Sequence, residues 1–152
     1  MNKKNWNKSL RYLLVLPLIF GLVLVRFFEE QLFYDPFLAY FKGEFLGKVF
    51  PDFQLGKVIF HVIFRYALNG ILSLGIIGLL FWDLRKVQFT ALILLGFLVI
   101  LLPLYIYMIQ NHFSLGENIG FYIRRFLIQP MLVLILIPAF YYQHFLQLQQ
   151  KD

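Results

Sequence analysis

Apolar residues gather in four segments of the chain, and polar residues separate these segments. The segments cover residues 12–28, 58–82, 88–109 and 121–142. As helices rising 1.5 Å per residue, the last three are long enough to cross a hydrocarbon core of about 30 Å. The first is shorter in its aliphatic part, and aromatic residues extend it into the interfaces. The pattern predicts an all-α polytopic membrane protein, with four transmembrane helices in a single membrane domain 1–152.

Composition supports a lipid environment. The 152 residues are 61% hydrophobic, 20% aromatic and only 14% charged, whereas a soluble domain carries about 25% charged residues. The chain has no cysteine, which excludes disulfides, thiolate metal sites and a cysteine nucleophile. The formal net charge is +6, but four of the cations precede the first apolar segment, where they orient the chain in the membrane. We therefore expect no nucleic-acid partner.

The distribution of basic residues predicts an orientation. The N-terminal segment is basic, and the short turn 83–87 carries Arg85 and Lys86. Under the positive-inside rule, both termini and this turn face the cytoplasm, and the loops 29–57 and 110–120 face outward. The first segment is followed by no cleavage site of small residues, so we expect an uncleaved anchor. Arg124 and Arg125 at the outer end of the fourth segment depart from the rule, which indicates a specific role for this pair.

The first outer loop opens with VRFFEEQLFYDPFLAYF. Asp35 followed by Pro36 is typical of a helix N-cap and first turn, so a short helix is expected to begin there. The loop is predicted to form an amphipathic interfacial helix, lying in the headgroup plane or folded back over the other helices. It either anchors the chain at the membrane surface or docks a partner. Acids occupy one face, and the other face carries apolar residues at helical spacing, namely Phe28, Leu32, Phe33, Phe37 and Phe41.

The second apolar segment carries a stripe of polar residues at steps of four: His61, Arg65, Asn69 and Ser73. Each step turns a helix by about 400°, so the four share one face. This face is expected to point into the bundle, because an arginine in lipid costs at least about 2.5 kcal/mol. Arg65 then needs an acidic partner, for which Glu29, Glu30 and Glu117 are candidates. The stripe is either an interhelical hydrogen-bond seam or an anion site centred on Arg65.

Four arginines are expected near one level in the outer half of the membrane. In the fourth segment Arg125 and Gln129 are four residues apart and share a face, so Arg125 is predicted to pair inward and Arg124 to meet lipid phosphate. Such a level could hold a lipid phosphate or the C-terminal region of a partner. The candidate interaction residues are Arg26, Glu29, Glu30, Asp35, His61, Arg65, Asn69, Ser73, Arg124, Arg125 and Gln129.

Other features of the apolar segments give further expectations. Pro103 and Pro130 are expected to kink the third and fourth helices. Tyr105, Tyr107, Tyr141 and Tyr142 are interpreted as aromatic belts at the two interfaces.

His61 and Ser73 are twelve residues apart, or about 18 Å along a helix, so they form no catalytic dyad. No hydrolase elbow, zinc-protease motif or phosphate-binding glycine loop occurs, and we expect no enzymatic activity, metal or cofactor.

Three phrases carry a resemblance, and the first and last of them are rather specific: RFFEEQLFYDPFLAYF, FRYALNGILSLGII and FYIRRFLIQPMLVLILIPAFYYQ. Over residues 26–143 the chain resembles the exosortase F system-associated protein family, which comprises small multi-pass membrane proteins of flavobacteria and their relatives. Exosortases use a catalytic cysteine to process C-terminal sorting signals at the outer face of the inner membrane. Because this chain lacks cysteine, the resemblance implies an accessory protein of the bacterial inner membrane, and the family supplies no active site.

The function expected from these observations is non-catalytic. The outer arginine level and loop would dock the exosortase, or the membrane-spanning tail of its substrate, within a protein sorting or surface export system. Membrane lipids are the other expected partners. One rival is a small lipid- or solute-binding or transport protein, in which the stripe from His61 to Ser73 lines a polar cavity. The other rival is a structural scaffold whose polar seam sets helix register.

Overall fold

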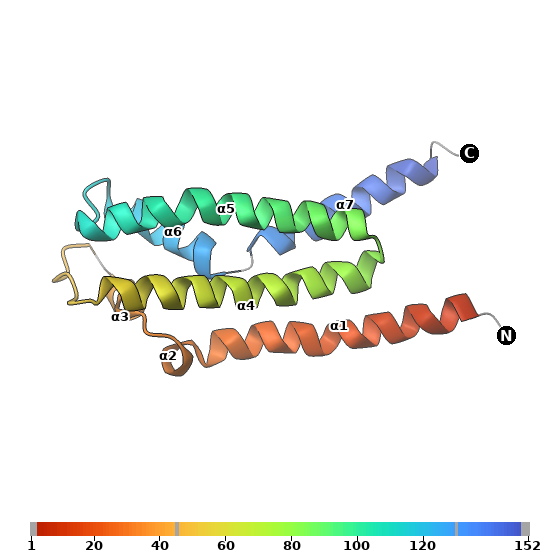
Figure 1. Cartoon of the computed structure of the whole chain (residues 1–152), viewed down its shortest axis with the longest axis horizontal. Coiled ribbons are helices and arrows are strands. Elements are labelled where there is room, and N and C mark those ends of the chain that lie inside the picture. The colour runs from red at the N-terminus through yellow and green to blue at the C-terminus, as the bar shows by residue number, and fades with distance from the viewer. Residues whose placement is uncertain (1–2, 45, 130, 150–152) are drawn as a thin grey trace.

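The computed structural model describes residues 3–44, 46–129 and 131–149, and within these ranges its regular secondary structure is all helix. The predicted all-α fold is therefore confirmed. The helices are α1 (Lys3–Phe27), α2 (Glu29–Leu32), α3 (Pro36–Tyr40), α4 (Leu55–Phe81), α5 (Leu84–Gln110), α6 (Glu117–Ile128) and α7 (Met131–Gln149) (Figure 1).

Three helices, α1, α4 and α5, are long and apolar enough to cross a membrane. The predicted fourth helix is wrong as a continuous element, because residues 121–142 are divided between α6 and α7. These two helices meet at 63° and count as a fourth candidate span only if the bent pair is taken together. Pro130, where a kink was expected, lies outside the described residues. At the other expected kink, helix α5 continues through Pro103.

The two central helices, α4 and α5, form a tight hairpin. Trp82 closes α4 in the left-handed conformation, with φ of 48°. The side chain of Asp83 then caps α5 by accepting a hydrogen bond from the backbone N–H of Arg85 at 2.9 Å. The turn is shorter than expected, since Arg85 and Lys86 already lie in the first turn of α5. This turn, the start of α1 and the end of α7 all lie at one end of the molecule, opposite α2, α3 and the 111–116 loop (Figure 1).

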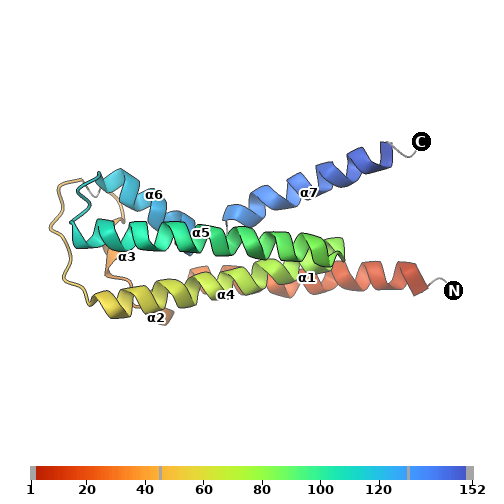
Figure 2. The ribbon, with the colours of Figure 1, turned by 45° about the horizontal axis from the view of Figure 1, so that its top comes forward.

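Helix α1 packs along α4 through a reciprocal pair of glycines. A Cβ added to Gly21 would lie 3.4 Å from Leu72, and one added to Gly75 would lie 3.0 Å from Leu18. Small residues are the usual means of close approach between membrane helices, because lipid provides no hydrophobic drive for association. Helix α7, by contrast, diverges from the bundle (Figure 2), and Val133 and Phe140 pack it against Ile77 of α4.

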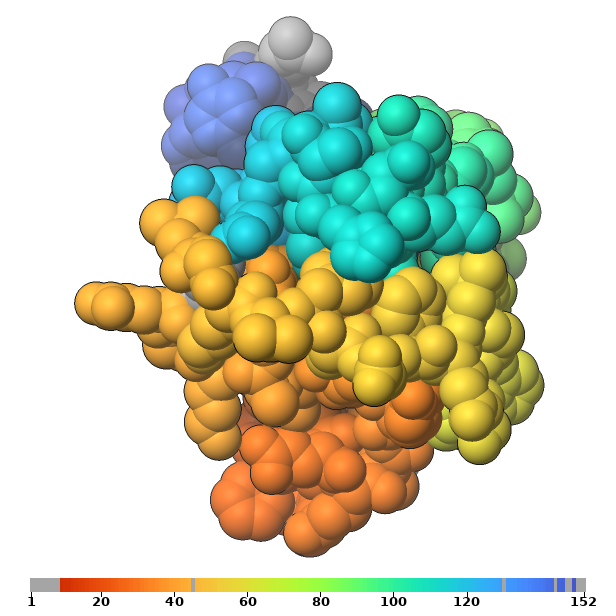
Figure 3. All heavy atoms as spheres, turned by 90° about the vertical axis from the view of Figure 1, so that its left-hand side faces the viewer, coloured from red at the N-terminus to blue at the C-terminus, as the bar shows by residue number. Residues whose placement is uncertain are grey.

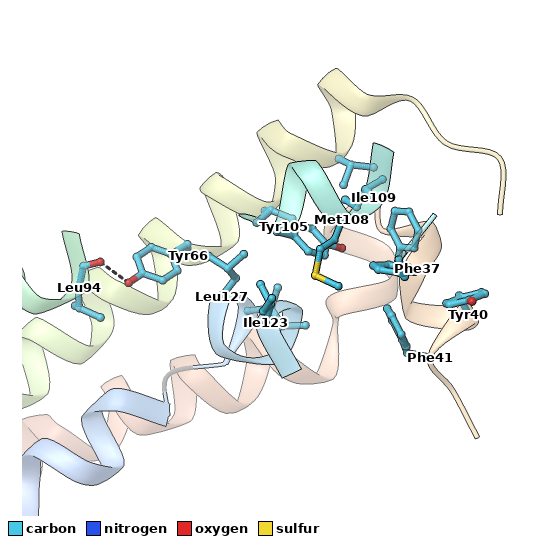
Figure 4. Packing of buried hydrophobic residues seen from close by; sticks show 14 residues of the cluster. Phe37, Tyr40, Phe41, Tyr66, Leu94, Tyr105, Met108, Ile109, Ile123 and Leu127 are labelled. Atoms are coloured by element: carbon cyan, nitrogen blue, oxygen red, sulfur yellow. Dashed lines mark hydrogen bonds between the residues drawn. The ribbon is translucent and has the colours of Figure 1, made fainter. Parts of the chain in front are cut away.

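The largest core cluster lies at the end that carries α3. Its side chains come from α3, α4, α5, α6 and the 111–116 loop (Figure 4). Phe37 is completely buried and Tyr40 and Phe41 nearly so, which means that α3 folds back against the helices. Of the predicted apolar stripe, Phe28 and Leu32 are instead exposed, because the chain is extended between α2 and α3 and the two short helices do not share a face. The placement of α3 relative to a membrane surface stays a prediction.

Candidate functional site

Three arginines and two carboxylates meet where α1, α2, α4 and α6 come together. Arg65 Nη2 donates to Glu29 Oε2, which also accepts from Arg26 Nη1 at 2.7 Å. Arg124 Nη2 donates to Asp35 Oδ2, and this oxygen lies 4.0 Å from Arg65 Nη1. The five side chains thus form a continuous series of ion pairs, in the order Arg26, Glu29, Arg65, Asp35, Arg124. We call this series the ion-pair chain.

The middle of the ion-pair chain is sheltered from solvent. The side chain of Arg65 is 2% exposed and those of Asp35 and Arg124 are 6% exposed, whereas Arg26 at one end is 55% exposed. Moving such charges out of water costs several kcal/mol per ion, and good pairing geometry is needed to offset it. The arrangement therefore links the α2–α3 segment firmly to α4 and α6. The pairing of Arg65 with Glu29 confirms one of the three predicted acidic partners of Arg65.

Asp35 has a different role from the predicted one. It occupies the N-cap position of α3, which begins at Pro36 as expected, but its side chain makes no capping hydrogen bond. Proline favours an extended conformation in the preceding residue, and Asp35 has φ of −143° and ψ of 84°. With this backbone, the carboxylate is directed to Arg124 and Arg65 instead of to the first turn of α3.

The predicted roles of the two adjacent arginines in α6 are reversed. Arg124 is the buried one, whereas Arg125 is exposed and its Nε donates to Gln129 Oε1 at 3.0 Å. Arg125 and Gln129 do share a face, but that face points away from the core. The signal that was missed is the spacing of the apolar residues: Arg124 lies on the same helix face as the buried residues Gly120, Ile123, Leu127 and Ile128.

The polar stripe on α4 is largely turned inward. Arg65, Asn69 and Ser73 are buried, while His61 is partly exposed and contacts Phe33 and Tyr34 with its ring. Asn69 Nδ2 donates to the backbone oxygen of Ile128 at 2.9 Å. Ile128 ends α6, and the last four carbonyl groups of a helix have no partner within it. Asn69 thus donates a hydrogen bond to a carbonyl group at the C-terminal end of α6, as expected for an interhelical hydrogen-bond seam.

Replacing Asn69 tests this contact. Asn69→Leu is expected to lower the free energy of unfolding by about 1–3 kcal/mol, because the Ile128 carbonyl is left buried without its donor. The measurement is unfolding in mixed detergent micelles, followed by circular dichroism. Asn111→Leu is the matched control: Asn111 Nδ2 also donates to a backbone oxygen, that of Tyr107 at 2.8 Å, but the site is exposed. Equal losses in the two variants would contradict this role of Asn69.

The burial of Tyr105 and of Tyr40 was not predicted from the sequence. Tyr105 was interpreted as part of an interface belt, but it is 1% exposed and packs beside Phe37 in the core. Tyr40, in α3, stacks against Phe113 with ring centroids 5.9 Å apart. Burial, followed by the negative charge of Glu117, raises the pKa of Tyr40 above its usual value.

Comparisons with protein-family models, with curated proteins and with solved structures found no match. The class of protein is therefore defined by the chain itself. Three helices long and apolar enough to cross a membrane, with charged side chains paired in the interior, indicate a multi-pass helical membrane protein.

Proposed function

We propose that this chain is an inner-membrane protein with four crossings and both termini in the cytoplasm, and that it acts as a non-catalytic accessory of an exosortase-linked sorting system. In this topology the bent pair α6–α7 is the fourth crossing. An even number of crossings agrees with the start of α1 and the end of α7 lying at one end of the molecule (Figure 1). The exosortase connection rests on the resemblance of the phrases at residues 26–41, 64–77 and 121–143.

The outer end of the molecule is the proposed docking surface for the exosortase or the membrane-spanning tail of its substrate. The observation that carries this proposal is the exposure of large apolar side chains on the loops at this end. Val49 is 93% exposed, Leu46 is 70% exposed and Leu115 is 51% exposed. In Figure 3, which looks onto this end, the 41–54 segment crosses the middle of the face and the 111–116 loop lies above it.

The ion-pair chain gives this surface its shape. Arg65 and Arg124 hold the α2–α3 segment in place from inside, so these two guanidinium groups position the docking surface and do not themselves contact the partner. The aromatic cluster around Phe37 supports the same segment from beneath. Arg26, which pairs with Glu29, and Arg125, which contacts Gln129, are exposed at the edge of this level.

Co-purification with a tagged exosortase in a mild detergent tests the proposal. Wild-type chain is expected to be recovered with the enzyme, and a variant carrying Leu46→Asn and Val49→Asn is expected to lose most of this recovery. Leu84→Asn is the control, since Leu84 is 77% exposed at the opposite end of the molecule. Failure to recover the enzyme with wild-type chain, together with normal sorting by an Arg65→Ala variant, would refute the accessory role.

A further inference from the structure

A groove runs beside the break between α6 and α7, where it faces the C-terminal part of α1. It has a volume of about 300 Å³. A second cavity of about 330 Å³ lies against α2, α3 and α6 and shares Arg26, Arg125, Ile128 and Gln129 with it. We call the first the α1–α7 groove. Its lining residues are Leu22, Val25, Arg26, Arg65, Asn69, Arg125, Ile128, Gln129, Met131 and Leu134.

The polar part of the α1–α7 groove is cationic. Three arginines line it, and among the described residues none of those lining it is acidic. The two carboxylates of the ion-pair chain pair with Arg26, Arg65 and Arg124. The ion-pair chain therefore has one positive charge in excess (three minus two). Arg125 adds a second, because within the described part of the chain its guanidinium contacts the amide of Gln129 and no carboxylate. This charge favours an anion.

A buried guanidinium group that lines the groove has hydrogen-bond donors without acceptors. Arg65 is 2% exposed, and its Nε and Nη1 have no hydrogen-bond partner within the described residues. Buried polar groups are normally hydrogen-bonded, and charged donors form the strongest such bonds with anionic oxygens. Glu29 accepts from Nη2 and Asp35 lies 4.0 Å from Nη1, so an anion in the groove would supply the hydrogen-bond acceptors that Nε and Nη1 lack.

The rest of the groove is apolar, and part of its lining is exposed. Leu22 and Val25 of α1 form one wall, and Met131 and Leu134 of α7 contribute to the other. Helix α7 diverges from the bundle on this side (Figure 2), and Leu134 is 71% exposed. A free inorganic anion would leave these side chains without contacts, whereas an acyl chain would cover them. The occupant therefore needs an anionic head and a hydrocarbon tail.

We propose that the α1–α7 groove is a binding site for an anionic phospholipid. The phosphate contacts Arg26, Arg65 and Arg125, and an acyl chain lies against Leu22, Val25 and Leu134. Ligand binding here is separate from docking at the outer end, so the inference holds whether or not the chain serves an exosortase.

The test uses the purified full-length chain in nonionic detergent after removal of bound lipid. Phosphatidylglycerol is titrated and its binding is followed by native mass spectrometry and by the midpoint of thermal unfolding. Phosphatidylglycerol is expected to bind and raise the midpoint, while phosphatidylcholine and inorganic phosphate do so weakly. Arg125→Gln is expected to weaken phosphatidylglycerol binding about tenfold or more, because a charge-assisted contact is lost. Its fold should persist, since Arg125 is exposed and takes part in no ion pair of the ion-pair chain.

Lys86→Gln is the matched control. Lys86 lines a cavity of about 290 Å³ at the other end of the molecule, together with Arg11, Tyr12 and Tyr141. This variant is expected to bind phosphatidylglycerol as wild type does. The proposal is overturned if phosphatidylcholine or inorganic phosphate binds as tightly as phosphatidylglycerol, if Arg125→Gln binds it normally, or if only Lys86→Gln loses it.

Discussion

Asp35→Asn is expected to lower the free energy of unfolding by about 3–5 kcal/mol, the typical cost of removing one partner from a buried ion pair. The Asp35 carboxylate accepts from Arg124 and lies 4.0 Å from Arg65, and all three side chains are almost completely buried. Asparagine keeps the size of the side chain but removes its charge, so Arg124 would lose its ion-pair partner and Glu29 alone would pair with Arg26 and Arg65. The measurement is unfolding in mixed detergent micelles, followed by circular dichroism.

Glu30→Gln controls for the general effect of removing an acid near α2. Glu30 pairs with Lys42 at 3.4 Å, but both side chains are more than 60% exposed, and exposed pairs contribute only about 0–1 kcal/mol. A second control replaces the pair by apolar residues, as Asp35→Leu with Arg124→Met. If burial of an unpaired charge is the cause, this double variant should lose less stability than the two single changes add up to. A loss below about 1 kcal/mol for Asp35→Asn would contradict the structural role of the ion-pair chain.

Periodicity along the chain predicted much of the fold and part of the site. The long apolar segments predicted the three helices α1, α4 and α5, and the four-residue steps predicted that Arg65, Asn69 and Ser73 face inward. These predictions succeed because each depends only on a single helix and on the cost of exposing charge to lipid. The same cost required an acid near Arg65, and the structure supplies Glu29.

The partners of Arg124 could not be predicted in this way, because they depend on tertiary contacts. Asp35 and Arg124 are 89 residues apart in the chain. They meet only because Phe37, Tyr40 and Phe41 fold α3 back into the bundle, which brings the preceding residue beside α6. The local rule that makes an aspartate before proline a helix cap was outweighed by two buried guanidinium groups. Local sequence indicated a kink in the fourth apolar segment, at Pro130, but not that the segment is divided into two helices that meet at 63°.

Gly120→Ala is expected to lower the free energy of unfolding by about 1–3 kcal/mol, the usual cost of overpacking a core. Gly120 is buried in α6, and a Cβ added there would lie 2.6 Å from Phe113 Cε1, well inside van der Waals contact. Phe113 has little freedom to move away. Its ring is surrounded by Phe37, Phe41 and Phe50 at centroid distances of 5.6, 5.2 and 5.5 Å. Its backbone has φ of 55° and its N–H donates to the Met108 oxygen at 2.7 Å.

Gly96→Ala separates this clash from the effect of alanine on a helix. Gly96 lies in α5, and a Cβ added there meets no atom within 4 Å. Alanine is about 0.8–1.0 kcal/mol more favourable than glycine in a helix interior, so Gly96→Ala should leave stability unchanged or raise it slightly. At position 120 the same gain opposes the clash, and a net loss therefore means that the steric cost is the larger effect. If Gly120→Ala is as stable as Gly96→Ala in the same micelles, Phe113 does not pack against α6, and the aromatic cluster does not fix the end of the molecule that carries α3.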